Sequence, residues 1–163
     1  MSVSTARHAT GTLPNVVYRN LDSPLGPLLA VATERGLVRL AFPMEDTGEV
    51  LKEISLRVSP RILDLPATAS GAGRAGRLDE ISRELDEYFR GRRRAFAATI
   101  DWCLTGGFTR RVLEAATAIP YGDTATYAQL AAAAASPRGA RAAGSALAAN
   151  PVPVVVPCHR VTR

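Results

Sequence analysis

Three strand-like runs, separated by two short turns, restrict the fold more than any other feature of this chain. The runs are VVYRNL (16–21), PLLAVAT (27–33) and LVRLAF (37–42). Turn-forming residues separate them, DSPLG before the second run and ERG before the third. The pattern predicts a three-stranded antiparallel meander.

The rest of the first half extends this meander into a small α+β unit. Residues 45–58 have the pattern of a short helix, and residues 59–77, rich in Pro, Gly, Ala and Ser, indicate a flexible surface connection. Apolar residues recur at helical spacing over residues 78–91. Residues 92–94, three arginines, are expected on a solvated surface, with a phosphate contact as the alternative. Residues 95–102 (AFAATIDW) are a candidate fourth strand, and the unit contains no visible chemistry.

The second half changes character, because it is rich in alanine and almost entirely helical in pattern. Residues 108–119 are amphipathic and predict one helix. Thr126 and Gln129 have the spacing of a capping box, which predicts a helix starting at Tyr127. A second short helix is expected in SPRGARAAGSALAAN, with Ser136 as its N-cap and the following proline at its first position. Two short helices joined by a tight turn predict a helix-turn-helix.

The composition limits the class of protein. A length of 163 residues suits one ordinary domain or two small ones, and 47% hydrophobic residues can form a core. No apolar run approaches the length needed to span a bilayer, so no membrane association is expected. Residues 1–15 lack the apolar segment of a signal peptide and are expected to be a disordered tail, which predicts a cytoplasmic protein.

The net charge indicates the kind of partner, and the cysteine and histidine content indicates whether a disulfide or a metal site is expected. The net charge of +5 comes mostly from arginine, which favours a polyanionic partner unless it reflects only a GC-rich gene. Two cysteines without a secretion signal are expected to be reduced rather than paired. Cys103 fits a small buried hydrophobic residue. Two cysteines and two histidines make no convincing zinc site, so neither a metal nor a cofactor is expected.

The segment PCHRV, Pro157 to Val161, carries the clearest chemistry. A cysteine thiolate is a strong soft nucleophile, and a neighbouring imidazole can accept its proton directly or through water. The preceding run VPVVV is expected to be a hydrophobic strand that delivers Cys158. Because neighbours on a strand point to opposite faces, either the backbone bends after Pro157 or a water molecule bridges Cys158 and His159.

PCHRV, preceded by NPVPVVV and ARAAGSALAAN, resembles the O6-alkylguanine-DNA alkyltransferase family, the methylated-DNA–[protein]-cysteine S-methyltransferases. IPYGDTATYAQLA (119–131) resembles their first DNA-binding helix, and SPLGPLLAVATERGLVRLAF resembles their amino-terminal domain. The resemblance implies an α+β fold in two parts. Residues 16–102 would form a small ribonuclease-H-like domain, an antiparallel sheet plus helices. Residues 103–163 would form a mostly helical, winged helix-turn-helix-like domain that binds DNA and accepts the alkyl group.

The resemblance also implies a reaction. An alkyl group would move irreversibly from O6-alkylguanine, or O4-alkylthymine, in double-stranded DNA to Cys158, once per molecule and without a cofactor. The protein would be a monomer that binds the minor groove and flips the damaged base out of the duplex. His159 would be the general base through water, Asn150 would brace the active-site turn, and Tyr127 would give a proton to the purine. The other implied residues are DNA-binding Arg141, as the finger that enters the base stack, with Ala140, Ala142, Gly144 and Arg160, and substrate-binding Val161, Pro153 and Leu147.

Members of the family continue beyond PCHRV with a glycine-rich segment and a helix whose glutamate orients the histidine. This sequence ends at Arg163, so we expect either a truncated homologue whose His159 lacks that carboxylate or a part of a longer protein. Two alternatives to an active alkyltransferase follow. One is an impaired homologue that binds alkylated DNA as a sensor or regulator. The other is a Cys–His hydrolase, although no oxyanion-hole motif is visible.

Overall fold

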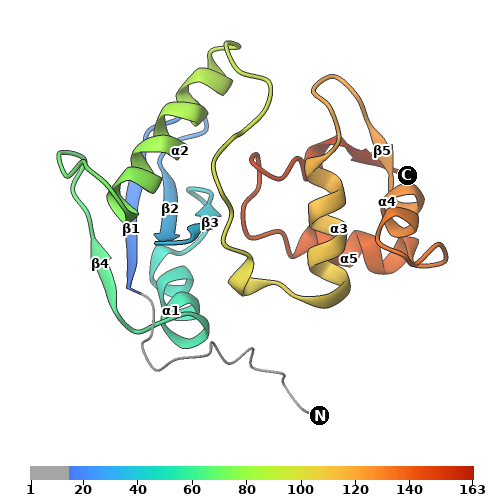
Figure 1. The fold of residues 1–163 in the computed structure, drawn as a ribbon, viewed down its shortest axis with the longest axis horizontal. Coiled ribbons are helices and arrows are strands. Elements are labelled where there is room, and N and C mark those ends of the chain that lie inside the picture. Colours follow the sequence, from blue (N-terminus) through green and yellow to red (C-terminus); the bar gives the residue numbers. More distant parts are fainter. Residues whose placement is uncertain (1–14) are drawn as a thin grey trace.

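The computed structural model describes residues 15–163 (Figure 1). Its main sheet confirms the predicted meander, formed by β1 (Val16–Leu21), β2 (Leu28–Thr33) and β3 (Gly36–Ala41). A fourth strand, β4 (Ile62–Asp64), pairs in parallel with β1, and the strand order is β3-β2-β1-β4. The prediction of an irregular connection over residues 59–77 is therefore wrong in part, because a short segment of it completes the open edge of β1.

The prediction of a strand over residues 95–102 is wrong. Only an isolated parallel bridge, Leu37 to Ile100, joins this segment to β3. The buried carboxylate of Glu84 accepts hydrogen bonds from the backbone N–H groups of Ala97, at 3.0 Å, and Ala98, at 3.1 Å. Those two groups are thus satisfied by a side chain instead of by a neighbouring strand.

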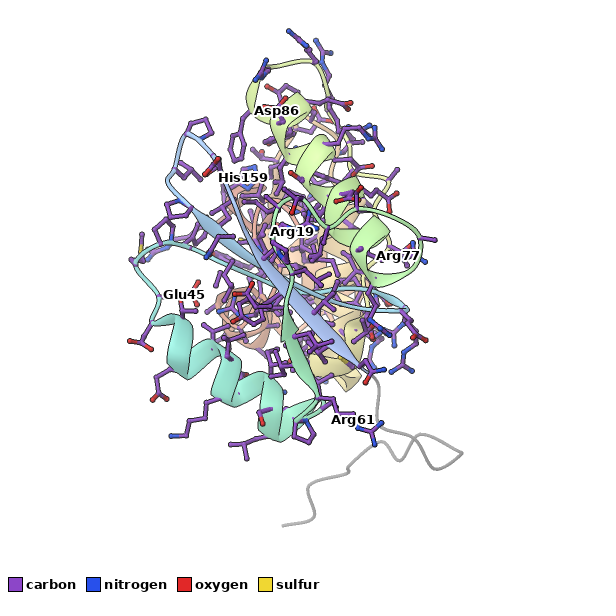
Figure 2. The ribbon with its side chains drawn as sticks, turned by 90° about the vertical axis from the view of Figure 1, so that its left-hand side faces the viewer. Arg19, Glu45, Arg61, Arg77, Asp86 and His159 are labelled. Atoms are coloured by element: carbon purple, nitrogen blue, oxygen red, sulfur yellow. The ribbon has the colours of Figure 1, made fainter. Side chains whose placement is uncertain are left out.

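Two helices cover opposite faces of the sheet. The helix α1 (Thr47–Arg57) matches the predicted short helix, and α2 (Arg74–Phe89) begins four residues earlier than the apolar pattern indicated. The period of two along β2 supplies both faces: Leu28, Ala30 and Ala32 belong to the core beneath α2, whereas Leu29 and Val31 belong to the core beneath α1. Under α2, the buried Arg19 of β1 forms a 2.8 Å ion pair with Asp79 (Figure 2).

The second half is helical, as predicted. It contains the short 3₁₀ helix η1 (Trp102–Leu104), then α3 (Gly107–Thr117), α4 (Tyr127–Ala133) and α5 (Ala140–Ala148), and the 3₁₀ helix η2 (Cys158–Arg160). A small parallel pair, β5 (Ala125–Thr126) with β6 (Val161–Thr162), closes this half. An N-terminal sheet layer followed by a helical layer confirms the expected α+β class (Figure 1).

The two halves share one hydrophobic core. A single cluster of buried side chains runs from the α2 face of the sheet through α3, α4 and α5 to the segment before Cys158. Residues 95–102, which lead into the second half, are held against β3, where Leu37 N–H donates to the Thr99 carbonyl at 2.8 Å. Gly36 is required there, since its φ is +153° and a Cβ would lie 2.4 Å from the Thr99 oxygen. The backbone of the segment that leads into the second half is therefore in direct contact with the start of β3.

The remaining expectations about the first half have mixed outcomes. Of the three arginines at 92–94, Arg92 is exposed, whereas Arg93 forms a 2.7 Å ion pair with Glu87 and so is not free on a solvated surface. Most of the expected N-terminal tail, residues 1–14, lies outside the described residues. Within residues 15–163, no helix is long and apolar enough to cross a membrane.

Candidate active site

Residues 150–157 form a compact turn, not the predicted hydrophobic strand. Only an isolated bridge joins Pro153 to Val156, and the Val156 N–H donates to the Val152 carbonyl at 2.9 Å. Val154 has φ of +73°, in the left-handed region that β-branched residues rarely adopt. The prolines explain the difference, because a proline has no N–H to donate to a strand ladder.

Asn150 holds this turn closed from the inside. Its Oδ1 accepts from the Val152 N–H at 3.0 Å, and its Nδ2 donates to the Val156 carbonyl at 3.1 Å. Val152 and Val156 are fully buried, so no solvent competes for these two backbone groups. The structure thus places Asn150 across the turn that precedes Cys158.

Cys158 begins η2, directly after a bend at Pro157. The bend has φ −80° and ψ 63° at Pro157, and it is one of the two arrangements expected for the Cys–His pair. The Cys158 N–H donates to the Val156 carbonyl at 2.8 Å, which fixes the backbone at the nucleophile. Cys158 is half-buried and His159 is exposed, so the cysteine has partial access to solvent and the histidine has more.

The pKa values of His159 and Cys103 differ from their ordinary values, and the two shifts bear on which side chains can react. Partial burial, helped by the positive charge of Arg160, lowers the pKa of His159 from its ordinary value. The imidazole is therefore neutral at pH 7 and can accept a proton. Burial, together with the carboxylate of Asp101, raises the pKa of Cys103 to about 12, so that thiol stays protonated and unreactive. Cys158 is the candidate nucleophile of the two cysteines.

The helix-turn-helix lies beside this turn. The capping box of α4 is present, with Gln129 N–H donating to Thr126 Oγ1 at 3.1 Å and Thr126 N–H donating to Gln129 Oε1 at 2.8 Å. The predicted start of the second helix is wrong: α5 begins at Ala140, after a turn closed by a 2.8 Å bond from Gly139 N–H to the Ser136 carbonyl. Proline at the second position of that turn is favoured there, which explains why it does not open the helix.

The two helices meet at Tyr127 and Gly144. A Cβ on Gly144 would lie 3.8 Å from the Tyr127 ring, so the glycine leaves α5 in ordinary contact range of the half-buried tyrosine. On the outer side of α5, Arg141 and Ala142 are exposed and Ala140 is half-buried. The result is a smooth face of small residues that carries one arginine.

The pairing of β5 with β6 joins the nucleophile to the helix-turn-helix. Val161 pairs with Ala125, three residues after Cys158 and two residues before Tyr127. The half-buried Pro153 lies in the turn before the cysteine. Leu147, predicted to bind substrate, is only 7% exposed and belongs to the core, so the structure does not place it at an open surface.

Arg160, which is predicted to contact DNA, is half-buried and makes two contacts within the protein. Its Nη1 donates to the Ile119 carbonyl at 2.7 Å, and its guanidinium lies 5.4 Å from the centre of the Tyr121 ring. A cavity of about 560 Å³ lies on this side of the turn, bordered by Arg160, Val154, Pro157, Trp102 and Tyr121 among others. Cys158 does not line it. The cavity is therefore distinct from the space in front of the thiol.

Sequence reasoning missed the contact that holds the other end of the turn. The Pro151 carbonyl accepts from Leu40 N–H at 2.9 Å and from Arg39 Nη1 at 3.1 Å. Both donors belong to β3, far away in the sequence, and no local pattern marks them. Within residues 15–163, no group of three His, Cys, Asp or Glu side chains could hold a metal ion.

Comparison with known proteins agrees with this geometry. Residues 16–102 match the family model of the 6-O-methylguanine DNA methyltransferase ribonuclease-like domain, and residues 107–163 match that of the DNA binding domain of the same family. The chain therefore belongs to the 6-O-methylguanine DNA methyltransferase family.

Individual relatives agree with the family assignment. The methylated-DNA–protein-cysteine methyltransferase of Mycobacterium leprae is 34% identical over 143 residues, covering 88% of this chain and 76% of the relative. The constitutive enzyme of that name from Bacillus subtilis is 33% identical, covering 88% and 79% of the two chains. The crystal structure of Mycobacterium tuberculosis OGT in complex with DNA has a TM-score of 0.70 and 30% identity, covering 90% of this chain and 78% of that one.

Proposed function

We propose that this protein repairs DNA by moving an alkyl group, typically methyl, from O6 of guanine or O4 of thymine in double-stranded DNA to Sγ of Cys158. One observation carries the proposal. In a chain of this family, a braced turn holds a half-buried cysteine beside a histidine that is neutral at pH 7, and a helix-turn-helix adjoins that turn. The named activity of the relatives from Mycobacterium leprae and Bacillus subtilis supports the same reaction.

The proposed chemistry is a displacement at the alkyl carbon. His159 accepts the proton of the Cys158 thiol through a water molecule, and the thiolate attacks the alkyl carbon. The C–O bond to the base breaks as the S–C bond forms. Tyr127 gives a proton to the departing guanine and regains one from solvent, which makes the base a better leaving group. Because the thioether is stable, each molecule reacts once.

The proposed DNA contact uses the outer face of α5. A face of small residues would allow the backbone to approach the minor groove, and Arg141, which is exposed, would enter the base stack where the damaged nucleotide has left. Ala140, Ala142 and Gly144 would line this approach. Flipping is required because the O6 alkyl group is unreachable inside the duplex. The solved complex of the Mycobacterium tuberculosis protein with DNA supports DNA as the partner.

Val161 and Pro153 would flank the flipped base in this proposal, with Val161 offering a backbone carbonyl to the guanine amino group. The division of labour would follow the two halves, residues 16–102 as support and residues 103–163 as the DNA-binding and alkyl-acceptor part. The proposal includes a monomer that acts in the cytoplasm. Neither a metal nor a cofactor takes part in the proposed step, since the DNA itself supplies the alkyl group.

Intact mass spectrometry tests the reaction. Incubation with an oligonucleotide duplex containing O6-methylguanine should add one methyl group to the protein, and peptide mapping should place it on Cys158. Cys158→Ala should abolish the addition, while Cys103→Ala, the matched control, should retain it. A folded protein that binds the duplex but gains no mass would reject alkyl transfer and favour a sensor of alkylated DNA.

A further inference from the structure

Arg160 is bound into the protein by two contacts of its side chain. Nη1 donates a 2.7 Å hydrogen bond to the Ile119 carbonyl, and the guanidinium lies over the Tyr121 ring at 5.4 Å. The Arg160 N–H also donates to the Pro157 carbonyl at 3.0 Å, closing the 3₁₀ turn that contains Cys158. One residue therefore shapes the turn with its backbone and anchors it with its side chain.

The acceptor of this hydrogen bond lies at the end of a helix. The helix α3 ends at Thr117, and Ile119 follows two residues later. Ile119 follows the C-cap residue, Ala118, so its carbonyl lies just beyond the helix, where a nearby cation is favoured by the helix dipole. The guanidinium thus ties η2 to the C-terminal end of α3 through a charge-assisted bond.

Tyr121 extends this anchor to the first half of the chain. The guanidinium of Arg94 lies 5.5 Å from the centre of the same ring, and Tyr88 of α2 meets it edge-on with centroids 6.2 Å apart. Tyr88 in turn packs against Phe96, at 5.0 Å between centroids. Tyr121 is therefore held by α2, by the connection between the halves and by the turn of the nucleophile.

We propose that Arg160 is a positioning residue that fixes the Cys158 turn through Ile119 and Tyr121, and that it makes no phosphate contact. The catalytic consequence rests on the function proposed above, whereas the anchoring itself does not. A guanidinium satisfies both contacts at once, because it is planar, donates along its edge and stacks on an aromatic ring with its face. An ammonium of similar charge offers no such plane, so lysine cannot replace arginine at this position.

Arg160→Lys separates positioning from DNA contact. If Arg160 positions the turn, the variant should bind undamaged duplex with unchanged affinity and unchanged salt dependence, while the single-turnover rate of alkyl transfer at saturating DNA falls by about tenfold. If Arg160 contacts a phosphate, lysine should preserve the rate and Arg160→Gln should reduce the salt slope by about one. Arg110→Lys, an exposed arginine paired with Glu114 at 2.8 Å, is the matched control and should change neither quantity.

A second variant and a second measurement keep the test independent of the reaction. Tyr121→Leu removes the ring from the opposite side of the contact and should slow transfer as Arg160→Lys does. Amide hydrogen exchange at Cys158 and Arg160 should become about tenfold faster in both variants, with exchange in the core helix α3 unchanged. If the wild type transfers no alkyl group, the amide exchange rates at Cys158 and Arg160 still show whether the Arg160 side chain anchors the turn. Unchanged exchange, or a reduced salt slope with a preserved transfer rate, would overturn the inference.

Discussion

Replacing Asn150 with alanine should destabilise the protein by about 3 kcal/mol. The Val152 N–H loses its acceptor in a fully buried site, which costs about 2 kcal/mol. The Val156 carbonyl loses one donor but keeps its 2.8 Å bond from Cys158 N–H, so that loss costs about 1 kcal/mol. Alanine also frees the turn in front of the thiol, so the transfer rate should fall as well.

Urea unfolding followed by the fluorescence of Trp102, the single tryptophan, measures the first effect. Asn20→Ala is the matched control, because Asn20 is exposed on β1, and it should change the free energy of unfolding by less than about 0.5 kcal/mol. If Asn150→Ala matches that control, the turn is stable without its side-chain bonds and the reasoning fails.

Three further outcomes are expected. Iodoacetamide at pH 8 should modify Cys158 in the native protein but leave Cys103, whose pKa is raised to about 12, unmodified until the protein unfolds; equal rates at both thiols would contradict this. Because the pKa of His159 is lowered in the folded protein, its neutral form persists below the ordinary titration range. Transfer should thus hold from pH 8 down past pH 6.5 and decline only at lower pH, and His159→Gln should lose that acidic limb in a pH–rate profile. Gly36→Ala should lower the free energy of unfolding by more than about 1 kcal/mol in the urea titration. The new Cβ would lie 2.4 Å from the Thr99 oxygen, and the φ of residue 36 is unfavourable for alanine. A variant as stable as the wild type would show that the backbone around Thr99 can move to make room.

Local patterns in the sequence predicted the parts of the fold that local physics determines. The meander of residues 16–42 and the capping box at Thr126 each depend on residues close together in the chain, and the structure contains both. The strand β4 has three residues, of which Leu63 is 55% exposed, so it carries no hydrophobic alternation to detect. Its formation depends on the free edge of β1.

Near the candidate site, the predicted strand before Cys158 is wrong, and the position of the Arg160 side chain could not be predicted from the motif. A run of valines indicates a strand, but prolines on both sides of Val154 and a positive φ at that residue turn the segment back on itself. Arg160 follows the nucleophile motif directly, yet adjacency in the motif gives no information about which side of the turn its guanidinium takes. That choice depends on Ile119 and Tyr121, which are distant in the sequence.

The hydrogen bonds from Leu40 and Arg39 to the Pro151 carbonyl have a consequence for biosynthesis. Within residues 15–163, the strands of the main sheet and the helices α1 to α5 all precede residues 150–160, so the ribosome makes them first. The backbone N–H of Leu40 and the side chain of Arg39 therefore lack their Pro151 acceptor until residues 150–160 have been made. The turn before Cys158 is complete only once these bonds form, so under the proposed function a nascent or partly unfolded chain would not present Cys158 in its assembled turn.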